Sequence, residues 1–233
     1  MEPIKRKLDS GSDNTKNVAK TKKSKTKESH SSELEAKKIK TPEEISIGRF
    51  VNGRTDIYPV WQSLLQRWFS ESSTEVYIVT PFMDLERLYE ICFFMLENQS
   101  AANLRAIYVR EISNVRVPKK NPPKFIPYWK FGPGYKPDDP EAYGALIRAF
   151  LDAFSPKYRS YVKEHVISKL TNPKSTFHGK FAAGVKANSA QVLITSANFQ
   201  GHHFDHNNYE TVCYSTMTKL DFEDRFLNNI QIE

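Results

Sequence analysis

The sequence has no long apolar run and very little cysteine. No segment approaches the roughly 18 uninterrupted apolar residues of a membrane-spanning helix, and the first 40 residues lack the apolar core of a secretory signal. The two cysteines, Cys92 and Cys213, lie in apolar stretches, which favours buried reduced thiols over the alternative of a single disulfide. These absences predict a soluble intracellular protein.

Acidic residues are too few to balance the basic ones, but only at one end of the chain. Residues 1–40 hold twelve Lys and Arg against six Asp and Glu, whereas the other 193 residues hold 22 against 21. The net charge of +7 therefore comes almost wholly from the N-terminal segment. It does not by itself indicate that the rest of the chain binds nucleic acid.

The N-terminal segment has a composition typical of disorder. Its few apolar side chains cannot bury enough surface to offset the entropy lost on ordering, so we predict a disordered tail over residues 1–42 and a folded domain over residues 43–233. Basic clusters at residues 5–7 and 20–27 suggest a nuclear import signal or a tether for polyanions. The alternative is a solvated tail that no receptor reads.

The remaining sequence alternates between helical and strand patterns, which predicts a layered α/β domain with a mixed sheet flanked by helices. Apolar residues repeat with helical spacing from residue 56 to 70, and Asp84 can cap a second helix. Further helices are expected over residues 140–154, 158–170 and 218–228, and strands over residues 75–81, 104–109, 176–185, 190–196 and 209–215.

Residues 113–140 interrupt this alternation with seven prolines, which exclude a long helix or a central strand. Basic and aromatic residues interleave across this region. Because basic groups follow phosphates while aromatic rings stack on unpaired bases, we predict a surface for single-stranded nucleic acid. The alternative is a proline-rich loop with solvated lysines. The candidate substrate-binding residues here are Lys119, Lys120, Lys124, Tyr128, Trp129 and Lys130.

The most informative pattern lies between residues 175 and 212. His178 and Lys180 are two apart on an expected strand, and Ser196 and Asn198 are two apart on the next, so each pair shares a face of its strand. A hairpin would bring the four side chains together. The ammonium would neutralise a phosphodiester, the hydroxyl and carboxamide would donate hydrogen bonds to it, and the imidazole would attack phosphorus. The alternative is that these are ordinary strand residues.

These motifs resemble those of the phospholipase D superfamily. The matching elements are H-x-K at residues 178–180, S-x-N at 196–198, N-x-E at 208–210 and the strand VYIVTPFM at 76–83. The resemblance implies a phospholipase D-like fold and a reaction that passes through a phosphohistidine and needs no metal or cofactor. It also implies that Glu210 belongs to the catalytic group, holding the other N–H of His178.

The chain departs from the family pattern at one position. The family's Asp after H-x-K falls at Val185. The tyrosyl-DNA phosphodiesterase branch also lacks this Asp, and its spacing is similar to the separation of His178 from Asn198. The departure weakens the match without removing the chemistry.

The family's reaction requires two histidines, one as nucleophile and one as general acid. This chain has a single H-x-K. The resemblance therefore implies a two-fold homodimer in which each subunit contributes His178.

A histidine-rich segment, HHFDH, follows S-x-N at residues 202–206. We expect His202 and His203 to contact substrate, because this loop would lie beside the site. A metal centre is the alternative, but the spacing matches no standard closed zinc site.

Together these features predict an intracellular, nuclear phosphodiesterase that acts on DNA or RNA. The first alternative is a catalytically inactive relative that binds nucleic acid or protein, which Val185 and the single H-x-K favour. The second is a phospholipase, although nothing in the sequence supplies a membrane anchor.

Overall fold

A computed structural model of the protein describes residues 49–113, 128–129, 147–173, 177–204 and 208–230. All of them belong to one compact unit, Lys38–Glu233. The expected disordered tail, residues 1–42, lies outside the described residues, as does most of the proline-rich region.

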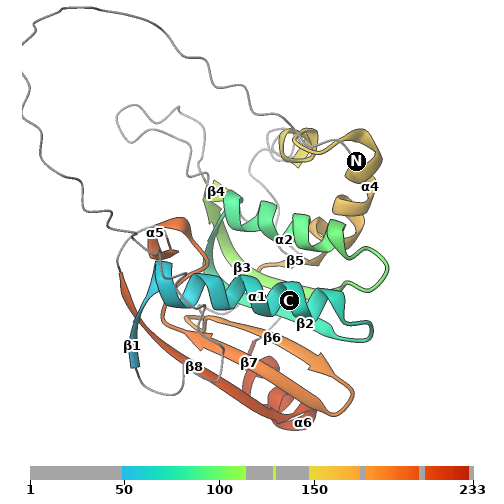
Figure 1. Ribbon diagram of the computed structural model, residues 1–233. Helices are drawn as coiled ribbons and strands as arrows, with labels where there is room; N and C mark the ends of the chain where they lie inside the picture. The colour runs from blue at the N-terminus through green and yellow to red at the C-terminus, as the bar shows by residue number, and fades with distance from the viewer. Residues whose placement is uncertain (1–48, 114–127, 130–146, 174–176, 205–207, 231–233) are drawn as a thin grey trace, which may run out of the picture. The chain divides into compact units, whose positions relative to one another are not determined.

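A mixed sheet of eight strands organises the described residues (Figure 1). β2 runs parallel to β3, β3 runs parallel to β5, and the other neighbouring strands are antiparallel. The strand order is β1 (Arg49–Asn52), β8 (Tyr209–Thr218), β7 (Ser189–Thr195), β6 (Phe181–Lys186), β2 (Glu75–Asp84), β3 (Asn103–Ser113) and β4 (Tyr128–Trp129), with β5 (Leu170–Thr171) paired to β3.

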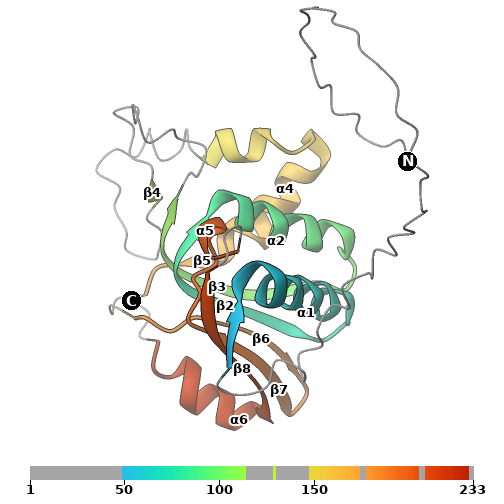
Figure 2. The same cartoon turned by 60° about the vertical axis from the view of Figure 1, so that its left-hand side comes forward.

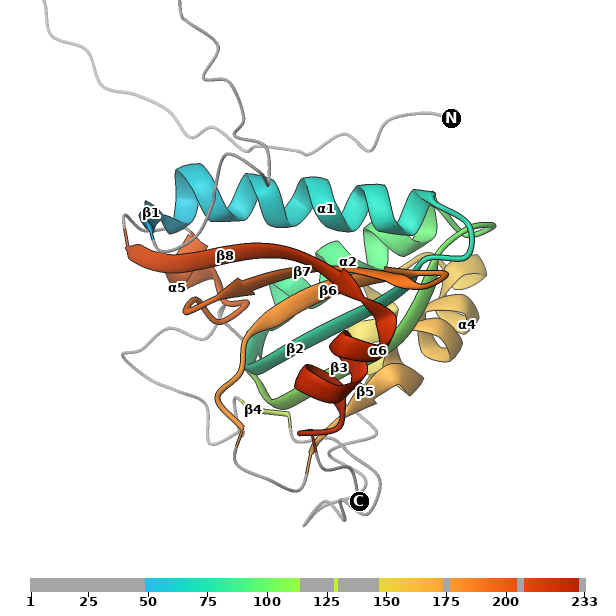
Figure 3. The same cartoon turned by 90° about the horizontal axis from the view of Figure 1, so that it is seen from below.

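Helices cover both faces of this sheet, which confirms the expected α/β class (Figures 2 and 3). One face carries α1 (Tyr58–Ser70), α2 (Leu85–Glu97) and α4 (Pro156–His165), which bury the larger apolar cluster. The other face carries α6 (Lys219–Phe222) and the π-helical turn Glu223–Leu227, which bury a second cluster.

The two long helices form where the sequence predicts them. α1 has Pro59 in its first turn and buries Trp61 and Trp68 on one face. The side chain of Asp84 caps α2 by accepting a hydrogen bond of 2.9 Å from the backbone N–H of Arg87. Helix entry at both places therefore follows from local sequence signals.

The strand expected over residues 176–185 begins later than predicted, at Phe181. Phe181 pairs with Val79 of β2, so an earlier start would place Gly179 opposite Pro81. Proline has no backbone N–H to donate, and the ladder between β2 and β6 stops before it. His178 and Lys180 therefore precede the strand instead of lying on it.

Val185, where the resemblance to the phospholipase D superfamily leads one to expect an Asp, lies in the second apolar cluster. Val185 is 2% exposed and pairs with Ala190 of β7. It is five residues beyond Lys180, which corresponds to about 16 Å of extended chain. A carboxylate here would be buried among apolar side chains, which gives a packing reason for valine.

Both cysteines are free thiols, as the sequence predicts. Cys92 is fully buried on α2, and burial raises the pKa of its thiol. Cys213 on β8 is only partly buried, less than expected.

In the described part of the chain, no helix has both the length and the apolar character needed to cross a bilayer.

Candidate active site

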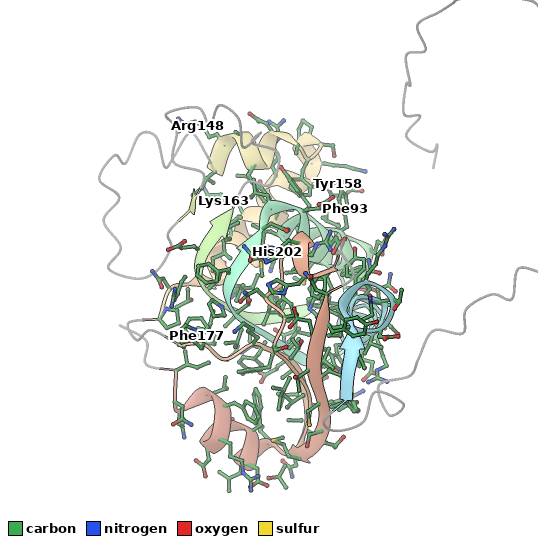
Figure 4. The ribbon with its side chains drawn as sticks, turned by 90° about the vertical axis from the view of Figure 1, so that its left-hand side faces the viewer. Phe93, Arg148, Tyr158, Lys163, Phe177 and His202 are labelled. Atoms are coloured by element: carbon green, nitrogen blue, oxygen red, sulfur yellow. The ribbon has the colours of Figure 1, made fainter. Side chains whose placement is uncertain are left out.

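Five strand ends meet at one edge of the sheet. The carboxyl ends of β2 and β3 lie beside the amino end of β6, and the carboxyl end of β7 lies beside the amino end of β8. The backbone carbonyl of Lys180 accepts a hydrogen bond of 3.0 Å from the N–H of Thr195, so H-x-K and S-x-N leave neighbouring strands together. Figure 4 looks onto this edge, with His202 on α5 (Gly201–Phe204) and Phe177 on the segment before β6.

Ser196 is fixed between the backbone of β8 and a carboxylate. Its hydroxyl donates a hydrogen bond of 2.5 Å to Oε2 of Glu210 and accepts one of 2.8 Å from the N–H of Thr211. Its own N–H donates to the carbonyl of Thr211 at 2.9 Å. Because the hydroxyl proton is directed to Glu210, Ser196 holds that carboxylate in place, whereas we expected it to donate to a phosphate.

The second carboxylate oxygen of Glu210 contacts a histidine other than the expected one. Nδ1 of His203 lies 2.6 Å from Oε1 of Glu210. We expected Glu210 to hold His178, but both of its oxygens are occupied by Ser196 and His203. The short α5 helix, between β7 and β8, brings His203 onto this carboxylate.

Asn198 lies on the other side of the His203 ring. Its amide nitrogen is 3.4 Å from Nε2 of His203. Its carbonyl oxygen Oδ1 is buried and has no hydrogen-bond partner among the described residues. A carboxylate accepts and an amide nitrogen donates, so an imidazole protonated on Nδ1 with its lone pair on Nε2 satisfies both neighbours.

Two cations lie at this edge. Partial burial lowers the pKa of Lys180, and the nearby charge of Arg110 lowers it further, while Glu210 opposes both effects. The ammonium donates a hydrogen bond of 2.8 Å to the carbonyl of His178. Arg110, on β3, lies over the ring of Phe82, with its guanidinium carbon 5.0 Å from the ring centroid. The mutual repulsion of the two cations makes the edge a suitable place for an anion.

The imidazole of His178 is exposed. Within the described ranges it makes no hydrogen bond, ion pair or ring contact. Its position next to Lys180 leaves the ring available to an external group.

A buried aspartate holds the loop that carries Asn198. Asp84 accepts a hydrogen bond from the N–H of Gly201, and its own N–H donates to the carbonyl of Phe199 at 3.3 Å. The hydroxyl of Thr80 accepts from the N–H of Phe199, also at 3.3 Å. These contacts tie the residues after S-x-N to the end of β2.

The charge of Asp84 is balanced beneath the site. Arg87 is 3% exposed, and its Nε lies 3.9 Å from Asp84 and 3.4 Å from Glu90. Its guanidinium also lies over the ring of Tyr58, 4.7 Å from the centroid. The network fixes α2 against the loop before α5.

The α5 helix packs against aromatic rings and against a glycine. Phe204 is fully buried, with its ring centroid 5.3 Å from Tyr58 and 6.1 Å from Trp61. A Cβ on Gly53 would lie 2.0 Å from the carbonyl oxygen of His203. Only glycine permits this close approach, which sets the position of His203.

The structure describes only some of the predicted substrate-binding residues. His202 is exposed on α5, whereas His203 is partly buried and engaged with Glu210. Tyr128 and Trp129 form β4 beside the end of β3, and the structure describes their backbone alone. Four predicted residues lie wholly outside the described ranges: Lys119, Lys120, Lys124 and Lys130.

Two residues of this edge were not singled out from the sequence. Arg110 was one of many basic residues, and nothing local distinguished it from the others. Tyr209, 70% exposed and adjacent to Glu210, was only the middle residue of N-x-E. An exposed aromatic next to a motif glutamate was a signal that could have marked it.

In the described part of the chain, no three His, Cys, Asp or Glu side chains are grouped as metal ligands would be. Asp205 and His206 lie outside it.

Neither a scan against protein-family models nor a search of curated proteins finds a match to this sequence.

Proposed function

We propose that this chain is a metal-independent phosphodiesterase of the phospholipase D type that acts on nucleic acid. The observation that carries the proposal is the meeting, at one sheet edge, of an exposed imidazole, His178, with two cations, Lys180 and Arg110. A nucleophile beside paired cations is what displacement at an anionic phosphorus requires.

In this proposal Lys180 and Arg110 hold the phosphate oxygens, and the amide of Asn198 donates a hydrogen bond to them. His178 attacks phosphorus and forms a phosphohistidine, which water then hydrolyses. Ser196 and Glu210 fix the strand ends and do not touch the phosphate.

Nucleic acid is favoured over lipid as the substrate. Beside the site, the ring of Tyr209 is exposed where a base could stack on it. The segment 104–136 and the N-terminal segment are both rich in Lys and Arg, which bind the phosphates of a nucleic-acid backbone. A nuclear location, to which the two N-terminal basic clusters would direct the chain, is part of the proposal.

The test is cleavage of a labelled single-stranded oligonucleotide, DNA and RNA in turn, in the presence of EDTA. We expect cleavage that EDTA leaves unchanged and that His178→Ala abolishes. His165→Ala, the same substitution on α4, is the matched control and should retain the activity.

Two outcomes would replace the proposal. Binding of the oligonucleotide without cleavage would make the chain a binding module. Hydrolysis of phosphatidylcholine vesicles, with oligonucleotides left intact, would make it a phospholipase.

A further inference from the structure

The structure holds one histidine in an arrangement that the H-x-K motif does not explain. His203 lies between the carboxylate of Glu210, at 2.6 Å from Nδ1, and the amide of Asn198, at 3.4 Å from Nε2. A carboxylate on one ring nitrogen fixes the tautomer and balances the charge that the ring acquires when it takes up a second proton.

No other described histidine has these contacts. His165, on α4, packs its ring against Tyr161 with centroids 4.4 Å apart. His202 is exposed on α5, with its ring centroid 4.0 Å from that of His203. The contact of His203 with the carboxylate of Glu210 joins α5 to β8.

The position of His203 is built into the fold. Its helix is anchored at Gly201 by the buried Asp84 and at Phe204 by the aromatic cluster of α1. Gly53 allows the backbone of His203 to approach closely. The backbone on both sides of His203 is therefore fixed, and its imidazole is held next to Asn198 and Glu210. Packing alone does not require an imidazole at this position.

We propose that His203 is the general acid and base of the reaction, so that one subunit carries both imidazoles. This inference rests on the proposed function. It replaces the partner's histidine with one from the same chain, and Glu210 becomes the residue that positions it.

The two steps balance as follows. With substrate bound, the amide of Asn198 donates to the phosphate and His203 carries a proton on Nε2 as well as on Nδ1. A nitrogen of His178 forms a bond to phosphorus while the bond from phosphorus to the leaving oxygen breaks, and His203 gives its Nε2 proton to that oxygen. Water then attacks phosphorus, His203 takes a proton from it, and the bond to His178 breaks. The products are an alcohol and a phosphate monoester, and both histidines return to their starting states.

A leaving-group comparison tests this assignment. An oligonucleotide has an alkoxide leaving group that needs a proton, whereas a p-nitrophenyl ester of a nucleotide has a leaving group that does not. For His203→Asn we expect the first turnover of the oligonucleotide to slow by about 10²- to 10⁴-fold. The initial burst of nitrophenolate should stay close to that of the wild type, with slow turnover after it.

Three further measurements complete the test. His178→Ala should lose both reactions, and Glu210→Gln should show the same dependence on leaving group as His203→Asn. Thermal melting of each variant establishes that it is folded. If His203→Asn does not fold, Glu210→Gln and wild type diluted to a monomer carry the test, because activity per subunit should not fall on dilution.

The results that overturn the assignment differ from those that overturn the function. Equal losses on both substrates, or no loss, in folded His203→Asn would exclude His203 as the acid while leaving the phosphodiesterase in place. Activity that disappears on dilution to a monomer would restore the homodimer. A wild type that cleaves neither substrate would overturn the proposed function, and this inference with it.

Discussion

Glu210 is the residue on which the arrangement of the site depends. Its carboxylate accepts a hydrogen bond from the hydroxyl of Ser196 and contacts the ring of His203, so it links β7, β8 and α5 at a single point. The N-x-E motif predicted a role for this residue. Its partner could not be predicted from spacing, because the choice between His178 and His203 is made by the fold.

Lys180 is expected to trade stability for function. Partial burial lowers its pKa, which means that carrying the charged ammonium costs more free energy in the folded state than in the unfolded chain. In the range between its folded and unfolded pKa values the unfolded chain binds more protons, and stability therefore rises with pH. Lys180→Met removes this penalty. We expect the variant to be more stable than wild type at neutral pH and inactive.

Urea unfolding at neutral and at alkaline pH checks this prediction, since the advantage of Lys180→Met should shrink as the pH rises. Lys163→Met, at an exposed lysine on α4, is the matched control. A Lys180→Met variant that is less stable than wild type at neutral pH would show that the ammonium stabilises the fold.

Asp84 is expected to support both the fold and the site. Asp84→Ala removes the cap of α2, leaves the N–H of Gly201 without its acceptor and takes away one of the carboxylates that balance the charge of the buried Arg87. We expect a loss of about 3 kcal/mol in the free energy of unfolding, measured with urea, together with reduced activity. Asp84→Asn keeps a capping oxygen and should lose less. A neutral effect of Asp84→Ala would contradict the proposed anchoring.

At the scale of elements, the site is a consequence of where β6 begins. Pro81 ends the ladder between β2 and β6, so residues 178–180 leave the sheet next to the end of β7. The parallel unit β2–α2–β3 contributes Arg110 and Asp84 from the same edge. Elements far apart in sequence therefore supply the cations, the imidazoles and the anchor.

Val185, at the position where the phospholipase D pattern has an Asp, is expected to be required for folding. Val185→Asp would restore the pattern but bury a carboxylate against α6, and we expect a loss of roughly 3 to 5 kcal/mol in the free energy of unfolding. Val185→Thr should cost less, because a hydroxyl is cheaper to bury than a charge. Urea unfolding of both variants measures the difference. If Val185→Asp left the free energy of unfolding unchanged, position 185 would have to be accessible to water.

The elements were more predictable than the contacts between them. Apolar periodicity predicted α1 and α2, and a capping residue predicted the start of α2, because both signals are local. The short strands β1 and β5 have no such signal and exist through pairing with β8 and β3. The site followed the same rule: the motifs predicted which segments meet, but not that α5 would bring His203 to Glu210.

At the scale of the whole molecule, the reactivity of the two free thiols measures how tightly the folded unit is packed. Cys92 is fully buried and its pKa is raised, whereas Cys213 is partly exposed. We expect a thiol reagent to label Cys213 in the native protein and Cys92 only on unfolding. Mass spectrometry of labelled peptides across a urea series measures this. Equal labelling of both in native buffer would contradict the packing of α2.

The number of subunits that a complete site needs is also a whole-molecule property. Counting H-x-K motifs predicts two subunits, whereas the ion pair of His203 with Glu210 supplies a second imidazole within one chain. The two views agree on His178 as the nucleophile, and the covalent intermediate is common to both.

Trapping that intermediate tests the central claim most directly. Wild type and His178→Ala are mixed with a p-nitrophenyl nucleotide, quenched in alkali, in which phosphohistidine survives, and examined by peptide mass spectrometry. We predict a nucleotidyl group on the peptide that contains His178, and none in the His178→Ala variant. Nitrophenolate release with no adduct on His178, or with the adduct on another residue, would contradict the account.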